Sequence, residues 1–171
     1  MVTVDPKAAA SAHQFTVVID GVETAVHEGV LRCGGGGTVA VVAPGVLEVT
    51  RLRHVVVRGA GDVRFSRCGY AAAEGCAAAS FRRCGAVRAD GARGVAVRRC
   101  RSADVERAGA ARVRGAGELR VGRCREADVA GCADAAVARC RVLAISSTWP
   151  CACAVCVLCV RVSPGLGMCR R

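Results

Sequence analysis

Residues 93–124 divide into four octads: RGVAVRRC (93–100), RSADVERA (101–108), GAARVRGA (109–116) and GELRVGRC (117–124). The third and fifth residues of every octad are apolar. Apolar residues two apart are typical of a β-strand, and no helical period of 3.6 is present. The same frame holds for thirteen octads from Gly37 to Cys140. Each octad is therefore predicted to be a short strand followed by a bend.

The last two places of the octad describe the bend. From residue 59 onward the seventh place is always Arg or Gly, which indicates a solvated corner that carries charge or needs backbone freedom. The eighth place often holds cysteine, and Ala fills it at 92, 108 and 116. A place that accepts Cys or Ala is predicted to be small and buried. Seven of the thirteen cysteines follow this spacing: Cys68, Cys76, Cys84, Cys100, Cys124, Cys132 and Cys140.

The number of octads in one coil is estimated from internal identity. Residues 81–104 and 105–128 are identical at twelve of 24 positions, whereas residues 97–112 and 113–128 are identical at five of 16. The longer shift favours three octads per coil, so that residues 24 apart would stack on one of three faces. A two-sided coil of two octads, similar to the octapeptide arrays of ice-nucleation proteins, is the alternative.

Segments such as ELRVGRC (118–124) and ADVAGCADAAVARC (127–140) alternate apolar residues along a strand and end on a small residue at the bend. This pattern resembles the right-handed parallel β-helix of the pectate-lyase-like superfamily over residues 37–148. The expected fold is all-β, a single-stranded right-handed parallel β-helix (solenoid) with about 24 residues per coil built from three octads. The resemblance implies a carbohydrate-active protein of the polysaccharide lyase or hydrolase type, or an inactive remnant of one.

The two ends of the chain depart from the octad frame. Residues 1–36 are expected to form an N-terminal cap or flexible lead, with two short strands around a turn. Residues 37–148 are the repeat domain, and residues 149–171 are expected to be a Cys-rich, apolar C-terminal cap or tail. Residues 142–160 carry no charge, which leaves a buried cap, membrane association and an unstructured tail as alternatives.

The C-terminal segment also contains a candidate metal site. Cysteines in a CxCxxCxxC spacing could supply thiolate ligands, although the spacers hold no glycine or polar turn residue. A buried strand explains the same residues without a metal. No cofactor is expected elsewhere. The candidate ligands are Cys151, Cys153, Cys156 and Cys159.

Charge is the most informative surface property. Lys and Arg total 25 against 14 Asp and Glu, a net charge of +11. In a coil of three octads, Arg64, Arg88 and Arg112 would occupy one outward place in three successive coils and form a ladder, and Arg99 and Arg123 would stack likewise. Like charges so close favour a polyanion above them. The expected partners are an acidic polysaccharide, a nucleic acid backbone or an acidic protein.

No catalytic arrangement is apparent in the sequence. The three histidines are scattered, and none belongs to a recognisable nucleophile motif. The N-terminal residues do not have the pattern of a secretory signal, which favours a reducing intracellular compartment. The sequence therefore predicts a non-enzymatic β-helix binding module with an Arg-rich face, and the carbohydrate-active protein is the alternative.

Overall fold

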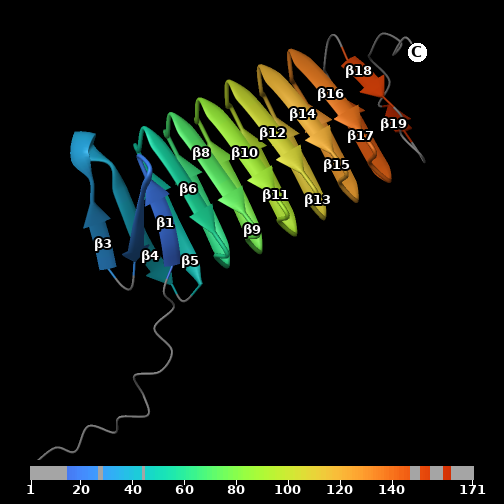
Figure 1. Ribbon diagram of the computed structural model, residues 1–171. Coiled ribbons are helices and arrows are strands. Elements are labelled where there is room, and N and C mark those ends of the chain that lie inside the picture. The colour runs from blue at the N-terminus through green and yellow to red at the C-terminus, as the bar shows by residue number, and fades with distance from the viewer. Residues whose placement is uncertain (1–14, 27–28, 44, 147–150, 155–159, 163–171) are drawn as a thin grey trace, which may run out of the picture.

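The computed structural model describes residues 15–26, 29–43, 45–146, 151–154 and 160–162. These residues form a β-solenoid of about six turns, in which successive strands from β5 (Val46–Thr50) onward alternate between two facing sheets (Figure 1). The described residues contain no α-helix, and a short 3-10 turn, η2 (Gly34–Gly36), precedes the repeats. The predicted all-β solenoid is therefore confirmed.

The strands are three to six residues long and belong to two sheets. The first sheet contains β1 (Phe15–Ile19), β2 (Val22–Val26), β6 (His54–Arg58), β8 (Tyr70–Glu74), β10 (Ala86–Asp90), β12 (Ser102–Glu106), β14 (Glu118–Gly122), β16 (Asp134–Ala138) and β18 (Cys151–Ala154). The second sheet contains β3 (Gly29–Arg32), β4 (Thr38–Ala43), β5 (Val46–Thr50), β7 (Asp62–Ser66), β9 (Ala78–Arg82), β11 (Gly94–Arg98), β13 (Ala110–Arg114), β15 (Glu126–Ala130), β17 (Val142–Ser146) and β19 (Val160–Val162).

The coil is built from two octads, so the expectation of three octads per coil is wrong. Strand β11 pairs in parallel with β9 and β13, which places Val97 opposite Phe81 and Val113. The same separation recurs in every parallel pair from β5 to β17. Successive coils are thus spaced by a 16-residue repeat, with one octad in each sheet.

The small size of the inward side chains explains the two-sided coil. A three-faced coil encloses a wider interior, which needs large side chains to reach the packing density of a protein core. Here alanine occupies the third place of the octads that form β8, β9, β12, β13, β15 and β16. Two sheets that face each other directly can close over such residues. Phe65 and Phe81 are the largest fully buried side chains, and their rings stack with centroids 4.8 Å apart.

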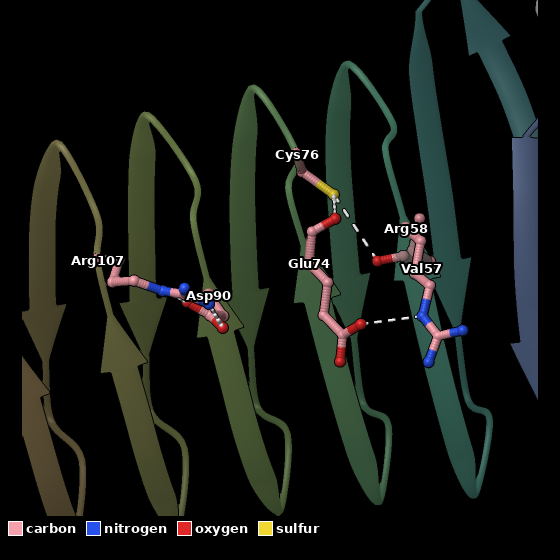
Figure 2. Close-up of polar contacts among 6 residues, drawn as sticks. All are labelled: Val57, Arg58, Glu74, Cys76, Asp90 and Arg107. Carbon is pink, nitrogen blue, oxygen red and sulfur yellow. Dashed lines mark hydrogen bonds and ion pairs between the residues drawn. The ribbon is translucent and has the colours of Figure 1, made fainter.

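The third and fifth places of the repeats are buried from Leu47 to Ile145, as the alternation predicts. The eighth-place residues are buried as well, and the cysteines among them are 1 to 4% exposed. Their thiols lie 3.3 to 3.7 Å from the carbonyl oxygen two residues earlier. The Cys76 thiol, for example, lies near the carbonyl oxygens of Glu74 and Val57 (Figure 2). Burial raises the pKa of Cys76 and Cys132, which keeps these thiols protonated.

The corners continue the hydrogen bonding from coil to coil. Every seventh-place residue from Arg51 to Arg139 has a positive φ, and each is Arg or Gly. The N–H of Arg67 donates to the carbonyl oxygen of Arg82 at 3.0 Å, and Arg83 donates to Arg98 in the same way. The predicted solvated corner is thus confirmed, and it requires the left-handed backbone region.

The N-terminal end differs from the repeats because its strands pair antiparallel. β1 lies between β2 and β6 in the first sheet, and the turn at Asp20 and Gly21 joins β1 to β2. In the second sheet, β4 pairs antiparallel with both β3 and β5. The octad frame begins at Gly37, whereas parallel stacking begins with β5 and β6. At the other end, β18 and β19 extend the two sheets.

Candidate functional site

The two long edges of the solenoid are formed by the corners between sheets. At one edge the chain passes from the second sheet to the first, at residues 50–53, 66–69, 82–85, 98–101 and 114–117. We call this edge the arginine edge. At the other, which we call the opposite edge, the chain returns from the first sheet to the second, beginning with residues 58–61.

The arginine edge carries an excess of positive charge. Five of its six described corners hold nine arginines and no acidic residue, and all nine side chains are exposed, whereas the sixth corner, residues 130–133, holds neither an arginine nor an acid. Arg82, Arg98 and Arg114 are direct neighbours at the ends of β9, β11 and β13. Next to them is a column at the seventh place, one residue per successive coil. This column consists of Arg51, Arg67, Arg83 and Arg99.

The opposite edge is balanced over the same four coils. The four arginine-edge corners from residue 50 to residue 101 hold eight arginines and no acid, whereas the four opposite corners from residue 58 to residue 109 hold three arginines and three acids. Two of these acids form ion pairs, Glu74 with Arg58 at 2.9 Å and Asp90 with Arg107 (Figure 2). Hydrogen bonds from Arg107 hold the pKa of Asp90 below its ordinary value. Over these four coils the fold thus separates the charges, whereas the opposite-edge corners at 122–125 and 138–141 hold four arginines and no acid.

Few of the arginine-edge guanidinium groups are paired within the protein. Arg114 forms an ion pair with Asp128 at 2.6 Å, and it alone of the nine is paired with a residue in the described part of the chain. Neighbouring coils lie about 4.8 Å apart, so like charges in one column repel each other unless counter-ions or a polyanion neutralise them.

The backbone of the column is held in an unfavourable conformation. The four column arginines have φ of 55 to 56°, a region that costs a residue with a side chain roughly 1 to 2 kcal/mol. Glycine takes the equivalent place in the next coil, at Gly115, without that cost. The seventh-place arginines of the opposite edge, Arg107, Arg123 and Arg139, share this conformation, with φ of 52 to 56°.

A polar groove lies beside the column at the first coils. It has a volume of about 410 Å³ and is lined by main-chain and hydroxyl groups together with the guanidinium groups. The Thr38 and Thr50 hydroxyl groups are hydrogen bonded to each other across its floor at 2.6 Å. The lining residues are Gly36, Thr38, Thr50, Arg51, Ser66, Arg67, Arg82 and Arg83.

The structure does not form the expected ladder. Arg64 in β7 and Arg112 in β13 lie on the second sheet, three coils apart, and Arg88 in β10 lies on the first sheet. Arg64 also forms an ion pair with Glu48 at 3.3 Å. The ladder prediction is wrong because residues 24 apart are one and a half coils apart, which places them on opposite sides.

The other charged candidates separate for the same reason. Arg99 lies on the arginine edge and Arg123 on the opposite edge, so they do not stack. Asp104 in β12 and Asp128 in β15, which a coil of three octads would bring together, lie in different sheets. The column of Arg51, Arg67, Arg83 and Arg99 was not predicted from the sequence. The sequence does contain the pattern that defines it, which is an arginine at every sixteenth position from residue 51 to residue 99.

The C-terminal candidates are only partly covered by the described residues. Cys151 and Cys153 belong to β18, while Cys156 and Cys159 lie outside the described residues, so the metal site stays a prediction. In the described ranges, no group of three or more metal-binding side chains is present. Residues 142–146 form β17, and no helix of the described chain is long and apolar enough to span a membrane.

Comparison with known proteins finds no similar protein. The chain matches no protein-family model, no curated protein and no solved structure. Fold and surface therefore define its class: a two-sided β-solenoid with an arginine-lined edge whose described corners hold no acidic residue. This class describes an architecture and does not by itself define a function.

Proposed function

We propose that the protein is a non-enzymatic binding module whose arginine edge holds a linear polyanion. The observation that carries the proposal is the column of Arg51, Arg67, Arg83 and Arg99, which adds one guanidinium group per coil on an edge without acids. A regular row of cations matches a regular row of anions, and guanidinium groups bind phosphate, sulfate and carboxylate oxygens in a bidentate manner.

The proposed ligand is linear because the site is linear. The guanidinium groups follow the solenoid axis for four coils, and the adjacent groove is polar and open along the same edge. Each contact neutralises one anionic group and releases its counter-ion, so binding is expected to weaken steeply as salt is added. The carbohydrate-active alternative, based on the pectate-lyase-like resemblance, would need clustered carboxylates. It gains no support from Asp104 and Asp128, because they lie in different sheets.

The chain itself offers a matched control for this proposal. Arg67, Arg83 and Arg99 on the arginine edge can be replaced by glycine, and so can Arg107, Arg123 and Arg139 on the opposite edge. Both triple variants lose three charges at left-handed corner positions, where glycine is compatible with the backbone. They differ in the edge that is neutralised and in the ion pair of Arg107 with Asp90, which only the opposite-edge variant loses.

The measurement is the salt concentration that elutes each variant from a dextran sulfate resin. We expect the arginine-edge variant to elute at clearly lower salt than the opposite-edge variant. In solution, the slope of the logarithm of the binding constant against the logarithm of salt should fall by about 2 to 3 for three lost contacts. Equal elution of the two variants would show that charge acts diffusely and would refute a binding edge.

A further inference from the structure

A pair of aromatic rings lies beside the arginine column. His54 and Tyr70 are the first residues of β6 and β8, and they are direct neighbours in the first sheet. Their rings are stacked, with centroids 4.6 Å apart and planes inclined by 9°. His54 is exposed and Tyr70 is half-buried, so this stack faces solvent and not the core.

The stack ends at Tyr70, because small residues occupy the next two levels. Ala86 in β10 is the neighbour of Tyr70 on the side away from His54, and Ser102 in β12 follows it. An alanine methyl group leaves the space that a third ring would fill. A planar ring inserted at the level of Ala86 would therefore continue the stack on the open face of Tyr70.

The positions of His54, Tyr70, Ala86 and Ser102 repeat with the same 16-residue interval as the column arginines. Arg51 precedes His54 by three residues, and Arg67 precedes Tyr70 by the same interval. Arg83 and Arg99 precede Ala86 and Ser102 likewise. Each coil therefore presents a guanidinium group at the corner and, just beyond it on the first sheet, a place for a planar ring.

A single-stranded nucleic acid has this combination of groups, since every nucleotide carries one phosphate and one planar base. Proteins that bind single strands combine a basic groove with aromatic side chains on which bases stack. The bases of a duplex are already stacked and paired, so they could not reach Tyr70 without strand opening.

An acidic glycan fits the same place less well. Sugar hydroxyl groups are recognised by carboxylate and amide oxygens that accept their hydrogen bonds. Residues 69–72 and 85–88, at the open face of Tyr70, include no Asp, Glu, Asn or Gln, whereas Asp20 adjoins the far side of the stack, where its N–H donates to the carbonyl oxygen of His54 at 3.1 Å. The surroundings of the stack therefore favour a π-stacking ligand over a hydroxyl-rich one.

We propose that the polyanion is a single-stranded nucleic acid, with phosphates along the arginine column and a base stacked on Tyr70 at the level of Ala86. This inference rests on the proposed function, because the column supplies most of the attraction. Recognition is independent of base sequence, since stacking on an aromatic ring accepts every base.

The test measures binding of labelled oligothymidylate and labelled dextran sulfate at one salt concentration. Tyr70→Ala should weaken oligothymidylate binding about tenfold or more, the usual loss of a stacked base, and leave dextran sulfate binding unchanged. Tyr70→Phe keeps the ring and should bind as the unmodified protein does. Far-UV circular dichroism of each variant verifies that the solenoid is intact.

The outcomes separate this inference from the proposed function. If the triple glycine variant of the arginine edge loses binding to both probes while Tyr70→Ala has no effect on either, the edge binds polyanions and the nucleic acid inference is wrong. A Tyr70-dependent preference for polygalacturonate over oligothymidylate would identify a glycan ligand and overturn it too. If the triple variant binds both probes normally, the proposed function itself fails.

Discussion

At the scale of single residues, the corner arginines carry two opposing effects. Glycine is the residue that best tolerates positive φ, and it occupies the seventh place at Gly59, Gly75 and Gly91. The arginine column occupies the same conformation with a full side chain. Each column arginine therefore reduces the stability of the fold while adding charge to its surface, and Arg107, Arg123 and Arg139 on the opposite edge do the same.

The positive φ of Arg83 predicts an unusual order of stability for substitutions at this position. Glycine and alanine remove the same charge, but only glycine relieves the left-handed backbone. We expect Arg83→Gly to be more stable than Arg83→Ala by about 1 kcal/mol, the reverse of the usual order in regular secondary structure. Urea denaturation of both variants measures the difference. A more stable alanine variant would contradict the strain at this corner.

At the scale of the strand and its bend, the close approach of successive coils limits which side chains fit. A Cβ atom added to Gly85 would lie 2.5 Å from the carbonyl oxygen of Gly69 in the preceding coil. Gly94, at the start of β11, has no atom within 4 Å of the corresponding position. Both glycines precede or begin a strand, but only one is required by packing.

Alanine substitutions at these two glycines should therefore have opposite effects. Gly85→Ala forces the coils apart locally, and we expect it to lower the free energy of unfolding by about 1 to 3 kcal/mol. Gly94→Ala has φ outside the left-handed region and open space, so it should be neutral or stabilise by up to about 1 kcal/mol. Thermal or urea unfolding tests both, and equal losses would refute the packing argument.

The octad was predictable in detail because each of its places has one physical role. Alternation at the third and fifth places predicted the strand, and Cys or Ala at the eighth place predicted a small buried site. Both predictions are confirmed, for example at Val97 and Cys100. The seventh place, restricted to Arg and Gly, predicted the corner that Arg99 now occupies.

At the scale of the whole molecule, the sequence was misleading about coil length. Identity at a shift of 24 reflects similarity between segments, whereas the coil is set by which strands pair. In a two-sided solenoid every octad is half a coil, so a strongly similar segment three octads away occupies the other sheet and still packs well. Arg88 and Arg112 are related in this way and lie on opposite sides.

The candidate site depends on the same distinction. A shift of 24 selects Arg64, Arg88 and Arg112, which the fold disperses, while a shift of 16 selects the column from Arg51 to Arg99. His54 and Tyr70 are also 16 residues apart, and they can be recognised as a stacked pair only when the coil length shows that they are neighbours. The composition predicted an arginine-rich surface, and the coil length determined that the arginines line one edge of the solenoid.

The central claim is therefore the coil of two octads, and the register of the parallel strands tests it most directly. In an isotope-labelled sample, nuclear Overhauser contacts between backbone protons reveal which residues are neighbours across strands. We predict contacts from Val97 to Phe81 and Val113, with the same separation repeated along both sheets. Contacts from Val97 to Ala73 and Val121 instead would establish a coil of three octads and remove the arginine column.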